Sequence, residues 1–463
     1  MNLQQLKLVI AVTAALGIAG AAHAKATADE LAQIGKKYTC TGAEKAGSAD
    51  GVAEFTGKWF GAAPGQSTEP GVHMADPYAS EKPIVVITAQ NYTQYADKLS
   101  EGQKAMFKKF PASFKMNIYP SHRDYRLSDA VCKNHVRNAK EAELTADGLD
   151  VVTGYRGAAL FPFPKTGAEL VWNGLMPARA SVDFRDTDLA IVYADGKIQW
   201  GKQNMWSLSA ANDPKLLDTK YEGVSAYTRI VTLLPEREKG LMTKTLDFFN
   251  FGREPRQGWQ YNPGTRRVRQ LPGFGFDMPN PSSGGTLTVD DTRLLNGSPE
   301  RYNWRIVGKK DIYIPYNGFK LESKVAGADN YAKLLTPGHE NPEFVRWELH
   351  RTWIVEGKLK EGFRHLYASR TLYMDEDNWQ FAMSDNFDAR GNLWKFNWSN
   401  STYVPGANVF NQGNAFYHDL VSGNYSAYDL TQARPKTFML NVFDAEYAKP
   451  EFFSLENLKA GGY

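Results

Sequence analysis

The chain changes character near residue 151, where it becomes rich in tyrosine, tryptophan, phenylalanine, valine and threonine, with turn residues at short intervals. Asp195-Gly196 lies between the apolar runs IVYA and KIQW, which is a strong hairpin signal. Residues 262–265 separate GWQY from RRVRQL in the same way, and residues 375–378 and 388–392 punctuate later runs. Short apolar runs divided by such turns predict an antiparallel meander, which we place at residues 151–400.

The segments on either side of the meander have different patterns. Residues 25–150 look mixed, with helical patterns at 28–37, 93–109 and 128–143. The glycine- and proline-rich stretch within them has few periodic apolar positions, so we expect 25–150 to be a partly helical wrap or lid over the sheet. Residues 401–463 contain interspersed proline and glycine and are expected to pack on the core as a C-terminal tail.

The register of the meander can be derived for residues 345–398. In residues 345–356 the odd positions are mostly apolar and the even positions mostly polar, so the odd side chains should face the interior. A turn at 358–361 would place Leu349 opposite Leu372 and Trp353 opposite Ala368. The strands then share one concave aromatic face, which is either packed core or the lining of a ligand cavity. The residues predicted to line such a cavity are Trp347, Leu349, Trp353, Leu372, Trp379, Phe381, Met383, Trp394 and Phe396.

Arg351 and Arg370 fall on this apolar face, and the predicted register makes them cross-strand neighbours. Two like charges there are unfavourable unless an anionic group neutralises them. One explanation is a structural network with an acid such as Asp385, or a bulge that turns one arginine outward. The functional explanation is that both arginines hold the anionic head group of a bound lipid or amphiphile.

The N-terminal segment predicts export. Lys7 precedes an unbroken run of apolar or small residues from 8 to 22, and Ala22-His23-Ala24 supplies a site for cleavage after Ala24. A membrane anchor is the alternative, but the run is shorter than the about 20 residues that span a bilayer. We therefore expect a periplasmic protein whose residues 1–24 are a cleaved signal peptide.

Charge and cysteine content add two expectations. The formal net charge is +3 over 463 residues, which does not suggest nucleic acid as a partner. In an oxidising compartment Cys40 and Cys132 are expected to form a disulfide, with two buried free thiols as the alternative. Two cysteines without a nearby histidine cluster do not suggest a metal site, and we predict neither a metal nor a cofactor.

Familiar catalytic motifs are missing from the sequence, including the nucleophile elbow, the zinc-protease motif and the phosphate-binding loop. The acidic run 375–377 could supply paired carboxylates for glycoside hydrolysis, but these residues also favour a simple turn. We therefore do not expect an enzyme and predict no catalytic residues. Arg266, Arg267 and Arg269 form a basic cluster that is either a surface for lipid head groups or an acidic partner, or a solvated strand end.

Several segments, in chain order, resemble the bacterial family catalogued as domain of unknown function 1329. They include FPFPKTGAELVWN, YNPGTRRVRQLP and RWELHRTWIVEGKLKEGFRHLYASRTLYMDEDNWQF. The family is similar to the periplasmic lipoprotein carriers of the Lol system. The resemblance implies an α+β fold, with a large, strongly curved antiparallel sheet forming a half-open barrel that helices close as a lid. It also implies an inner-membrane exporter of the resistance-nodulation-division (RND) type and an outer-membrane protein as partners, and it carries over no catalytic residues.

The function expected from these features is that of a periplasmic carrier or adaptor for a hydrophobic molecule or lipid, working with the exporter toward the outer membrane. Burial of acyl chains would supply affinity at roughly 25 cal/mol per Å² of apolar surface. The alternative is a structural or interaction subunit of a transport assembly, whose sheet is simply a packed core. A hydrolase acting on a hydrophobic substrate is the least favoured alternative.

Overall fold

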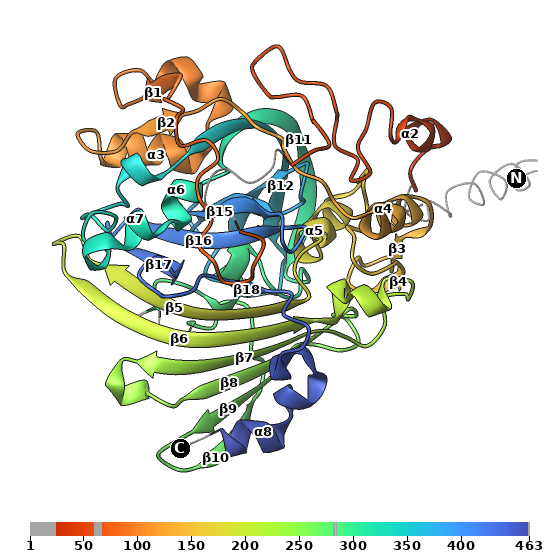
Figure 1. Cartoon of the computed structure of the whole chain (residues 1–463), viewed down its shortest axis with the longest axis vertical. Helices are drawn as coiled ribbons and strands as arrows, with labels where there is room; N and C mark the ends of the chain where they lie inside the picture. Colours follow the sequence, from red (N-terminus) through yellow and green to blue (C-terminus); the bar gives the residue numbers. More distant parts are fainter. Residues whose placement is uncertain (1–24, 60–66, 281–282, 284, 462–463) are drawn as a thin grey trace, which may run out of the picture.

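The computed structural model describes residues 25–59, 67–280, 283 and 285–461, and it shows an α+β protein with a large, mostly antiparallel sheet of 16 strands (Figure 1). The strands are β1 Val85–Ile87, β2 Met116–Ile118, β3 Glu143–Leu144, β4 Val151–Thr153, β5 Val182–Val192, β6 Ile198–Ser209, β7 Val224–Leu234, β8 Met242–Phe248, β9 Gln257–Asn262, β10 Arg267–Leu271, β11 Tyr302–Pro315, β12 Trp347–Leu359, β13 Ser369–Asp375, β14 Phe381–Phe387, β15 Leu393–Val404, β16 Val409–Asp419, β17 Tyr425–Leu430 and β18 Met439–Leu440. Strands β3 and β4 form a separate pair.

The helices are short and lie around the sheet. The α-helices are α2 Ala28–Gln33, α3 Glu101–Lys109, α4 Asp129–Glu141, α5 Gly167–Leu175, α6 Phe319–Glu322, α7 Lys324–Gly327 and α8 Leu455–Ala460. The 3-10 helices are η1 Tyr92–Lys98, η2 Ala210–Asn212, η3 Pro214–Leu216, η4 Glu236–Glu238, η5 Val289–Leu294, η6 Ala328–Tyr331, η7 Pro342–Phe344, η8 Glu446–Ala448 and η9 Pro450–Phe453.

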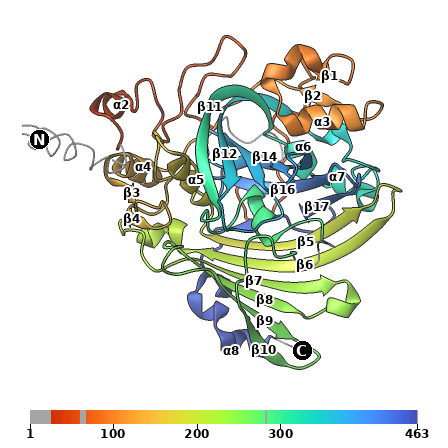
Figure 2. The same ribbon diagram turned by 180° about the vertical axis from the view of Figure 1, so that it is seen from behind.

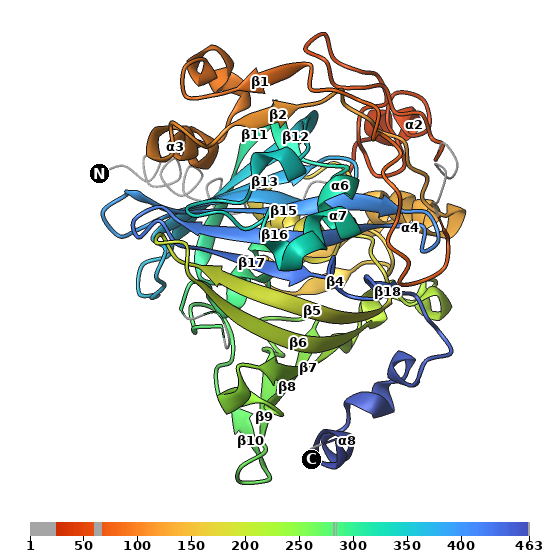
Figure 3. The same ribbon diagram turned by 60° about the vertical axis from the view of Figure 1, so that its left-hand side comes forward.

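The strand order shows that two halves of the chain meet in the middle of the sheet. The order is β1-β2-β12-β13-β14-β15-β16-β17-β5-β6-β7-β8-β9-β10, with β11 also paired to β12 and β18 to β5. Figure 3 shows β17 beside β5, with β6 to β10 continuing from there. Among the described strands β10 pairs only with β9, so the sheet is open. The predicted antiparallel sheet is confirmed, while its strong curvature into a half-barrel stays a prediction.

The local signals in the sequence mark real turns and helices. Asp195-Gly196 connects β5 to β6, and residues 262–265 connect β9 to β10. The helical pattern at 93–109 is interrupted, because the Ser100 hydroxyl accepts a hydrogen bond from the Gln103 amide and starts α3 anew after η1. The patterns at 28–37 and 128–143 correspond to the shorter helices α2 and α4.

The predicted register of β12 against β13 is wrong. Val355 pairs with Leu372 and Gly357 pairs with Arg370, so Leu349 and Trp353 are not opposite Leu372 and Ala368. The reason is the connection, because β12 continues to Leu359 and β13 starts only at Ser369, leaving a longer loop than the predicted turn. Arg351 and Arg370 are therefore six residues apart in register, or about 20 Å, and are not neighbours.

The outer segments contribute more to the sheet than predicted. Strands β16 and β17 lie within the supposed C-terminal tail, yet they occupy the centre of the sheet. Strands β1 and β2 come from the predicted wrap and extend the sheet next to β12, where β2 pairs parallel. The remaining wrap packs around the upper half of the molecule in Figure 1.

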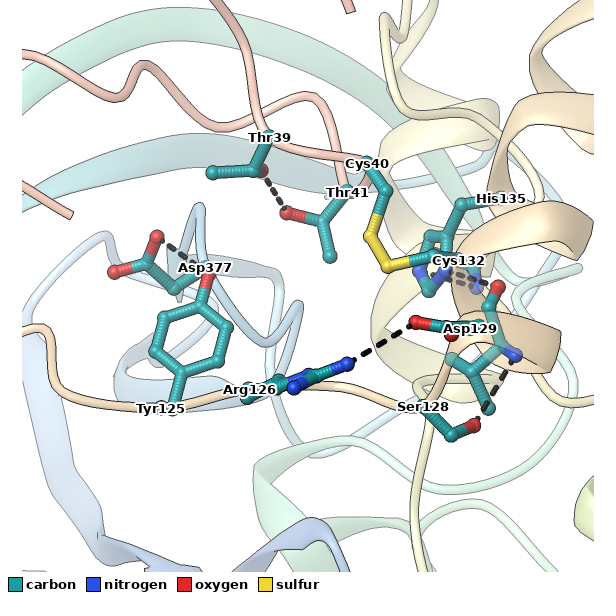
Figure 4. Close-up of a disulfide and its surroundings, with 12 residues drawn as sticks. Thr39, Cys40, Thr41, Tyr125, Arg126, Ser128, Asp129, Cys132, His135 and Asp377 are labelled. Atoms are coloured by element: carbon teal, nitrogen blue, oxygen red, sulfur yellow. Dashed lines mark hydrogen bonds and ion pairs between the residues drawn. A yellow bond between two sulfur atoms is a disulfide. The ribbon is translucent and has the colours of Figure 1, made fainter. Parts of the chain in front are cut away.

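The predicted disulfide is confirmed, since Cys40 and Cys132 are bonded with their Cα atoms 5.2 Å apart. Cys132 lies on α4, and Cys40 lies in the irregular segment that follows α2 (Figure 4). The same segment is held nearby by the indole of Trp379, which donates a hydrogen bond to the carbonyl of Thr41 at 3.0 Å. The disulfide therefore joins two parts of the wrap, its irregular N-terminal segment and α4, near a point where that segment also contacts the core.

A buried carboxyl group attaches α3 to the sheet. Asp385 of β14 accepts hydrogen bonds from the amide of Gly102 (3.0 Å), the hydroxyl of Ser100 (3.3 Å) and the hydroxyl of Tyr373 (2.9 Å). Its side chain is fully buried. Burial raises the pKa of Asp385 to about 7, although these hydrogen bonds oppose the shift.

Asp385→Asn is expected to remove part of the dependence of stability on pH. The folded protein keeps a proton on Asp385 up to about pH 7, whereas an unfolded aspartate releases it near pH 3.9. The folded state therefore binds more protons between these values, and this group makes the wild type lose stability as pH rises from about 4 to 7. In urea denaturation, Asp385→Asn should match the wild type at pH 4 and exceed it by about 1–3 kcal/mol at pH 8. Asp444→Asn at an exposed position is the control, and an unchanged pH profile for Asp385→Asn would contradict this assignment.

Candidate functional site

A cavity of about 200 Å³ lies against one face of strands β5 to β8. Side chains alternate between the two faces of a strand, so every second residue of these paired strands points toward the cavity. Most of these side chains are small, and they leave space that larger residues would fill. The strands contribute Asp183, Arg185, Gln203, Met205, Ser207, Ser209, Ala226, Thr228, Ile230, Thr232, Thr243, Thr245 and Asp247.

The opposite face of the same strands packs against the C-terminal residues (Figure 2). The ring of Trp206 lies 5.7 Å from that of Phe452, and the ring of Tyr227 lies 5.6 Å from that of Phe453. Further along, Leu458 of α8 packs with Met242 and Tyr261. The large apolar side chains thus stabilise the sheet from outside, while the hydroxyl-rich face borders the cavity.

The other wall of the cavity is more apolar. Phe410 and Tyr417 come from β16, and Tyr428 comes from β17. Leu287 and Val289 come from the connection between β10 and β11, which crosses the cavity. The site therefore combines a polar sheet wall with an aromatic and aliphatic wall, which suits a ligand that has both characters.

Two of the arginines at the cavity are neutralised by the protein. Arg185 forms ion pairs of 2.7 Å with both Asp183 and Asp429. Arg256 forms an ion pair of 2.5 Å with Asp247 and donates a hydrogen bond to the side chain of Asn296 at 2.8 Å. These contacts engage all three aspartates that line the cavity.

Arg179 and Arg293 also line the cavity but have no such partners. Within the described part of the chain, neither guanidinium has a carboxylate within 4.0 Å or a side-chain hydrogen bond. Burial and the nearby Arg179 and Arg185 lower the pKa of Arg293 to about 9, although Asp183 and Asp429 oppose the shift from beyond ion-pair distance. Burial also lowers the pKa of Arg179, although Asp247 and Asp183 oppose the shift from beyond ion-pair distance. Two guanidinium groups at one cavity without an ion-pair partner are unfavourable, which makes them the most unusual feature of the cavity.

The nine residues predicted to line a cavity lie elsewhere, and none of them borders the cavity against β5–β8. Eight of them are divided between two hydrophobic cores, so the expected single aromatic face is wrong. One core contains Trp347, Leu349, Met383 and Phe396, and the other contains Leu372, Trp379 and Phe381 with Trp353 packed against it. Trp394 is half-buried, with its ring 5.8 Å from that of Tyr367. Trp347 and Trp353 have the same parity in β12 and yet pack in different cores, which simple alternation along a flat strand does not anticipate.

The two arginines predicted to hold an anionic head group are engaged within the protein. Arg370 is fully buried and forms ion pairs with Asp290 at 2.9 Å and Asp291 at 3.2 Å. Arg351 donates a hydrogen bond to the carbonyl of Ala46 at 2.7 Å and lies 3.6 Å from Glu376. Both arrangements are structural networks of the kind considered as the alternative, although Asp385 is not the acid involved.

The acidic turn at 375–377 is confirmed as the connection between β13 and β14, but it is buried. His350, Asp375 and Asp377 each have a potential metal-ligand atom within 4.8 Å of the others. Asp377 is already held by Arg123, whose Nε and Nη2 atoms lie 2.8 and 2.6 Å from its two carboxylate oxygens. The turn thus belongs to a buried ion-pair network, and the expectation of no metal and no cofactor stays a prediction.

The basic cluster lies on the outermost hairpin of the sheet. Arg266 is in the turn between β9 and β10, and Arg267 and Arg269 are on β10. All three are exposed, and Arg269 donates a hydrogen bond to the side chain of Gln260 at 2.8 Å. Charged residues on an edge strand also prevent pairing with other chains, so a role in binding a partner or membrane stays a prediction.

Sequence reasoning missed the residues that border the cavity. Thr228 and Thr232 on β7 and Thr243 and Thr245 on β8 alternate with larger residues, and this alternation could have marked a face without core packing. Arg179 and Arg293 lie outside the strands and more than 100 positions apart, so no spacing in the sequence brings them together.

The predicted export segment, residues 1–24, lies outside the described residues. Within the part of the chain that the structure describes, the helices are all too short or too polar to cross a bilayer.

Comparison with known sequences gives a clear match. A family model described as "Protein of unknown function (DUF1329)" matches residues 86–459. An uncharacterized protein of Pseudomonas aeruginosa is 36% identical over 425 residues, which cover 91% of this chain and 92% of that protein.

Several solved structures are similar at low sequence identity. A DUF1329 family protein from Desulfovibrio piger has a TM-score of 0.39 and 14% identity, covering 60% of this chain and 92% of that chain. A putative outer membrane lipoprotein-sorting protein domain from Vibrio parahaemolyticus has a TM-score of 0.40 and 11% identity, with the same coverages of 60% and 92%. A LolA superfamily protein from Nitrosomonas europaea has a TM-score of 0.36 and 11% identity, covering 63% of this chain and 99% of that chain.

Proposed function

We propose that this chain, which belongs to the DUF1329 family, is a periplasmic carrier or adaptor that binds a hydrophobic or lipid-like cargo. The observation that supports this function is the cavity of about 200 Å³ against β5–β8, with its aromatic and aliphatic second wall. Burying a hydrocarbon chain there would supply roughly 25 cal/mol per Å² of apolar surface. Ligand cavities usually measure about 300–1,000 Å³, so this one suits a single chain or a small amphiphile.

The cellular setting is part of the proposal. A disulfide between Cys40 and Cys132 is typical of proteins in oxidising compartments, which agrees with the export segment predicted for residues 1–24. We also propose that the sheet is curved into a half-open barrel, and that the protein binds its cargo without catalysing a reaction on it. Nothing in the fold or in the matched proteins bears on the RND-type exporter or the outer-membrane partner, which stay predictions from the family resemblance.

Filling the cavity should abolish cargo binding. Thr228 of β7 points into the cavity, so Thr228→Phe places a large ring where the ligand would lie, whereas Thr228→Val keeps the volume. We expect the wild type and Thr228→Val, purified gently from periplasm, to carry a hydrophobic compound in native mass spectrometry. Thr228→Phe should retain less than about one tenth of it, a loss equivalent to 1.4 kcal/mol or more.

The same experiment separates the proposal from its alternative. A wild-type mass without any bound compound, and no uptake of added fatty acids or lysolipids, would exclude the carrier function and favour a structural or interaction subunit. Equal loading of Thr228→Phe and Thr228→Val would show that cargo binds elsewhere.

A further inference from the structure

Two arginines at the cavity, Arg179 and Arg293, are called the guanidinium pair below. Arg179 lies in the connection from α5 to β5, and Arg293 lies in η5 in the connection that crosses the cavity. Both residues line the same cavity, and the charge of Arg179 contributes to lowering the pKa of Arg293. Elements from distant parts of the chain therefore bring two cations to one place.

The other two arginines at the cavity, Arg185 and Arg256, have ion-pair and hydrogen-bond partners within the protein. Arg185 has two aspartates at 2.7 Å, and Arg256 has Asp247 at 2.5 Å and the Asn296 amide at 2.8 Å. The guanidinium pair has no comparable contact among the described residues. The difference is specific to the pair and is not a general property of the cavity.

The charged side chains that line the cavity have an excess of positive charge. Four arginines and three aspartates border it, and all three aspartates form ion pairs with Arg185 or Arg256. Carboxylates and phosphates fit the planar fork of donors on a guanidinium, often through two parallel hydrogen bonds. One anionic group bound by Arg179 and Arg293 would balance the charge and satisfy the donors that have no partner among the described residues.

The apolar wall is continuous with this charged region. Val289 lies four residues before Arg293 in η5, and both line the cavity together with Leu287 and Phe274. A ligand that places its anionic group at the guanidinium pair can therefore lay a hydrocarbon chain against these side chains. A purely ionic ligand would leave the apolar wall uncovered.

We propose that the guanidinium pair binds the single anionic group, a carboxylate or a phosphodiester, of a one-chain amphiphile whose hydrocarbon part occupies the cavity. The proposal rests on the carrier function and makes it specific, because it names the class of cargo as anionic. It also assigns the head-group role to Arg179 and Arg293 in place of Arg351 and Arg370, which the protein neutralises itself.

The test compares ligands that share one oleyl chain. Delipidated mature protein is titrated by calorimetry with oleate, with oleoyl-lysophosphatidylglycerol, with oleyl alcohol and with inorganic phosphate. The variant is Arg179→Met combined with Arg293→Met, and the control is Arg267→Met on the exposed β9–β10 hairpin. Circular dichroism and thermal unfolding confirm that each variant is folded, which we expect because neither guanidinium has an ion pair or a hydrogen bond among the described residues.

The wild type and the control should bind the two anionic ligands roughly 10- to 100-fold more tightly than oleyl alcohol. The double variant should lose this preference and bind all three oleyl ligands within about threefold of one another. The ratio of oleate to oleoyl-lysophosphatidylglycerol binding distinguishes a fatty-acid source from a phospholipid source.

Each other result has a defined meaning. Equal wild-type affinity for oleate and oleyl alcohol, or a preference for anions that persists in the double variant, overturns the anion site but leaves the carrier function standing. Binding of phosphate that depends on the pair, with no binding of any oleyl ligand, supports the anion site and overturns the carrier function. No binding of any of the four ligands overturns both.

Discussion

Arg370→Met is expected to lower the free energy of unfolding by about 3–5 kcal/mol, because it leaves two buried carboxylates without their cation. Arg370 has no exposed surface, and Asp290 and Asp291 are nearly or fully buried. Burial alone would raise the pKa of Asp290, but Arg370 and His365 outweigh it and hold that pKa below its usual range. Denaturant unfolding at pH 7 measures the loss.

The pH dependence of this loss in unfolding free energy distinguishes an effect of charge from an effect of packing. In the wild type Asp290 has a lowered folded-state pKa, so its contribution is present above pH 4 and is lost as pH falls. Without Arg370 the same carboxyl becomes easier to protonate, so the difference between variant and wild type should shrink toward pH 4. Exposed Arg390→Met is the control, with an effect within about 0.5 kcal/mol. A loss that is equally large at pH 4 and pH 7 would point to packing instead.

The substitution should also affect the cavity. Asp290 and Asp291 belong to η5, the same short helix that carries Val289 and Arg293. Arg370 therefore anchors one wall of the cavity from behind. If the carrier function is correct, the variant should bind cargo more weakly even under conditions where it remains folded.

Replacing both cysteines, as Cys40→Ser with Cys132→Ser, should lower the free energy of unfolding by up to about 4 kcal/mol. The two residues are 92 positions apart, and a link over a long loop removes much conformational freedom from the unfolded chain. Thermal unfolding of wild type and variant, each with and without dithiothreitol, measures the effect.

The reductant provides the internal control for this prediction. Dithiothreitol should shift the wild type toward the double variant and leave the double variant unchanged. The segment around Cys40 keeps other contacts, including the hydrogen bond from Trp379 to Thr41 and an ion pair of 2.7 Å between Glu44 and Lys309. A wild type that unfolds at the same temperature with and without reductant would show that these contacts suffice to hold the wrap.

Local patterns in the sequence predict the local structure well. Asp195-Gly196 and residues 262–265 mark hairpins because their turn chemistry is contained within a few residues. Ser100 shows the limit of this reasoning. The spacing of Ser100 and Gln103 is a helix-capping signal in the sequence, but it lies inside the segment 93–109 that was predicted to be a single helix. The Cys40–Cys132 bond followed from cysteine number and compartment, without any knowledge of distance.

Contacts between distant segments were not predictable in the same way. The partners of Arg370 lie about 80 positions earlier in η5, so no periodicity around residue 370 identifies them. The β12–β13 register depended on the length of one loop, and a shift of six residues kept the same face while changing every neighbour. The cavity is formed by β5–β8, β16, β17 and the crossing connection, so it exists only once these elements have assembled.

The position of β5 has a consequence for how the protein is made. Val192 of β5 pairs with Tyr425 of β17, so the two halves of the sheet join through strands from opposite parts of the chain. While the polypeptide is being synthesised, β5 to β10 emerge long before β17, and β5 is then an edge with unpaired backbone groups. Pairings between such distant residues form slowly, because a long loop must close before they stabilise anything. Each half can pair its consecutive strands locally, but the joining of the two halves is a late event that depends on β17, near the end of the chain.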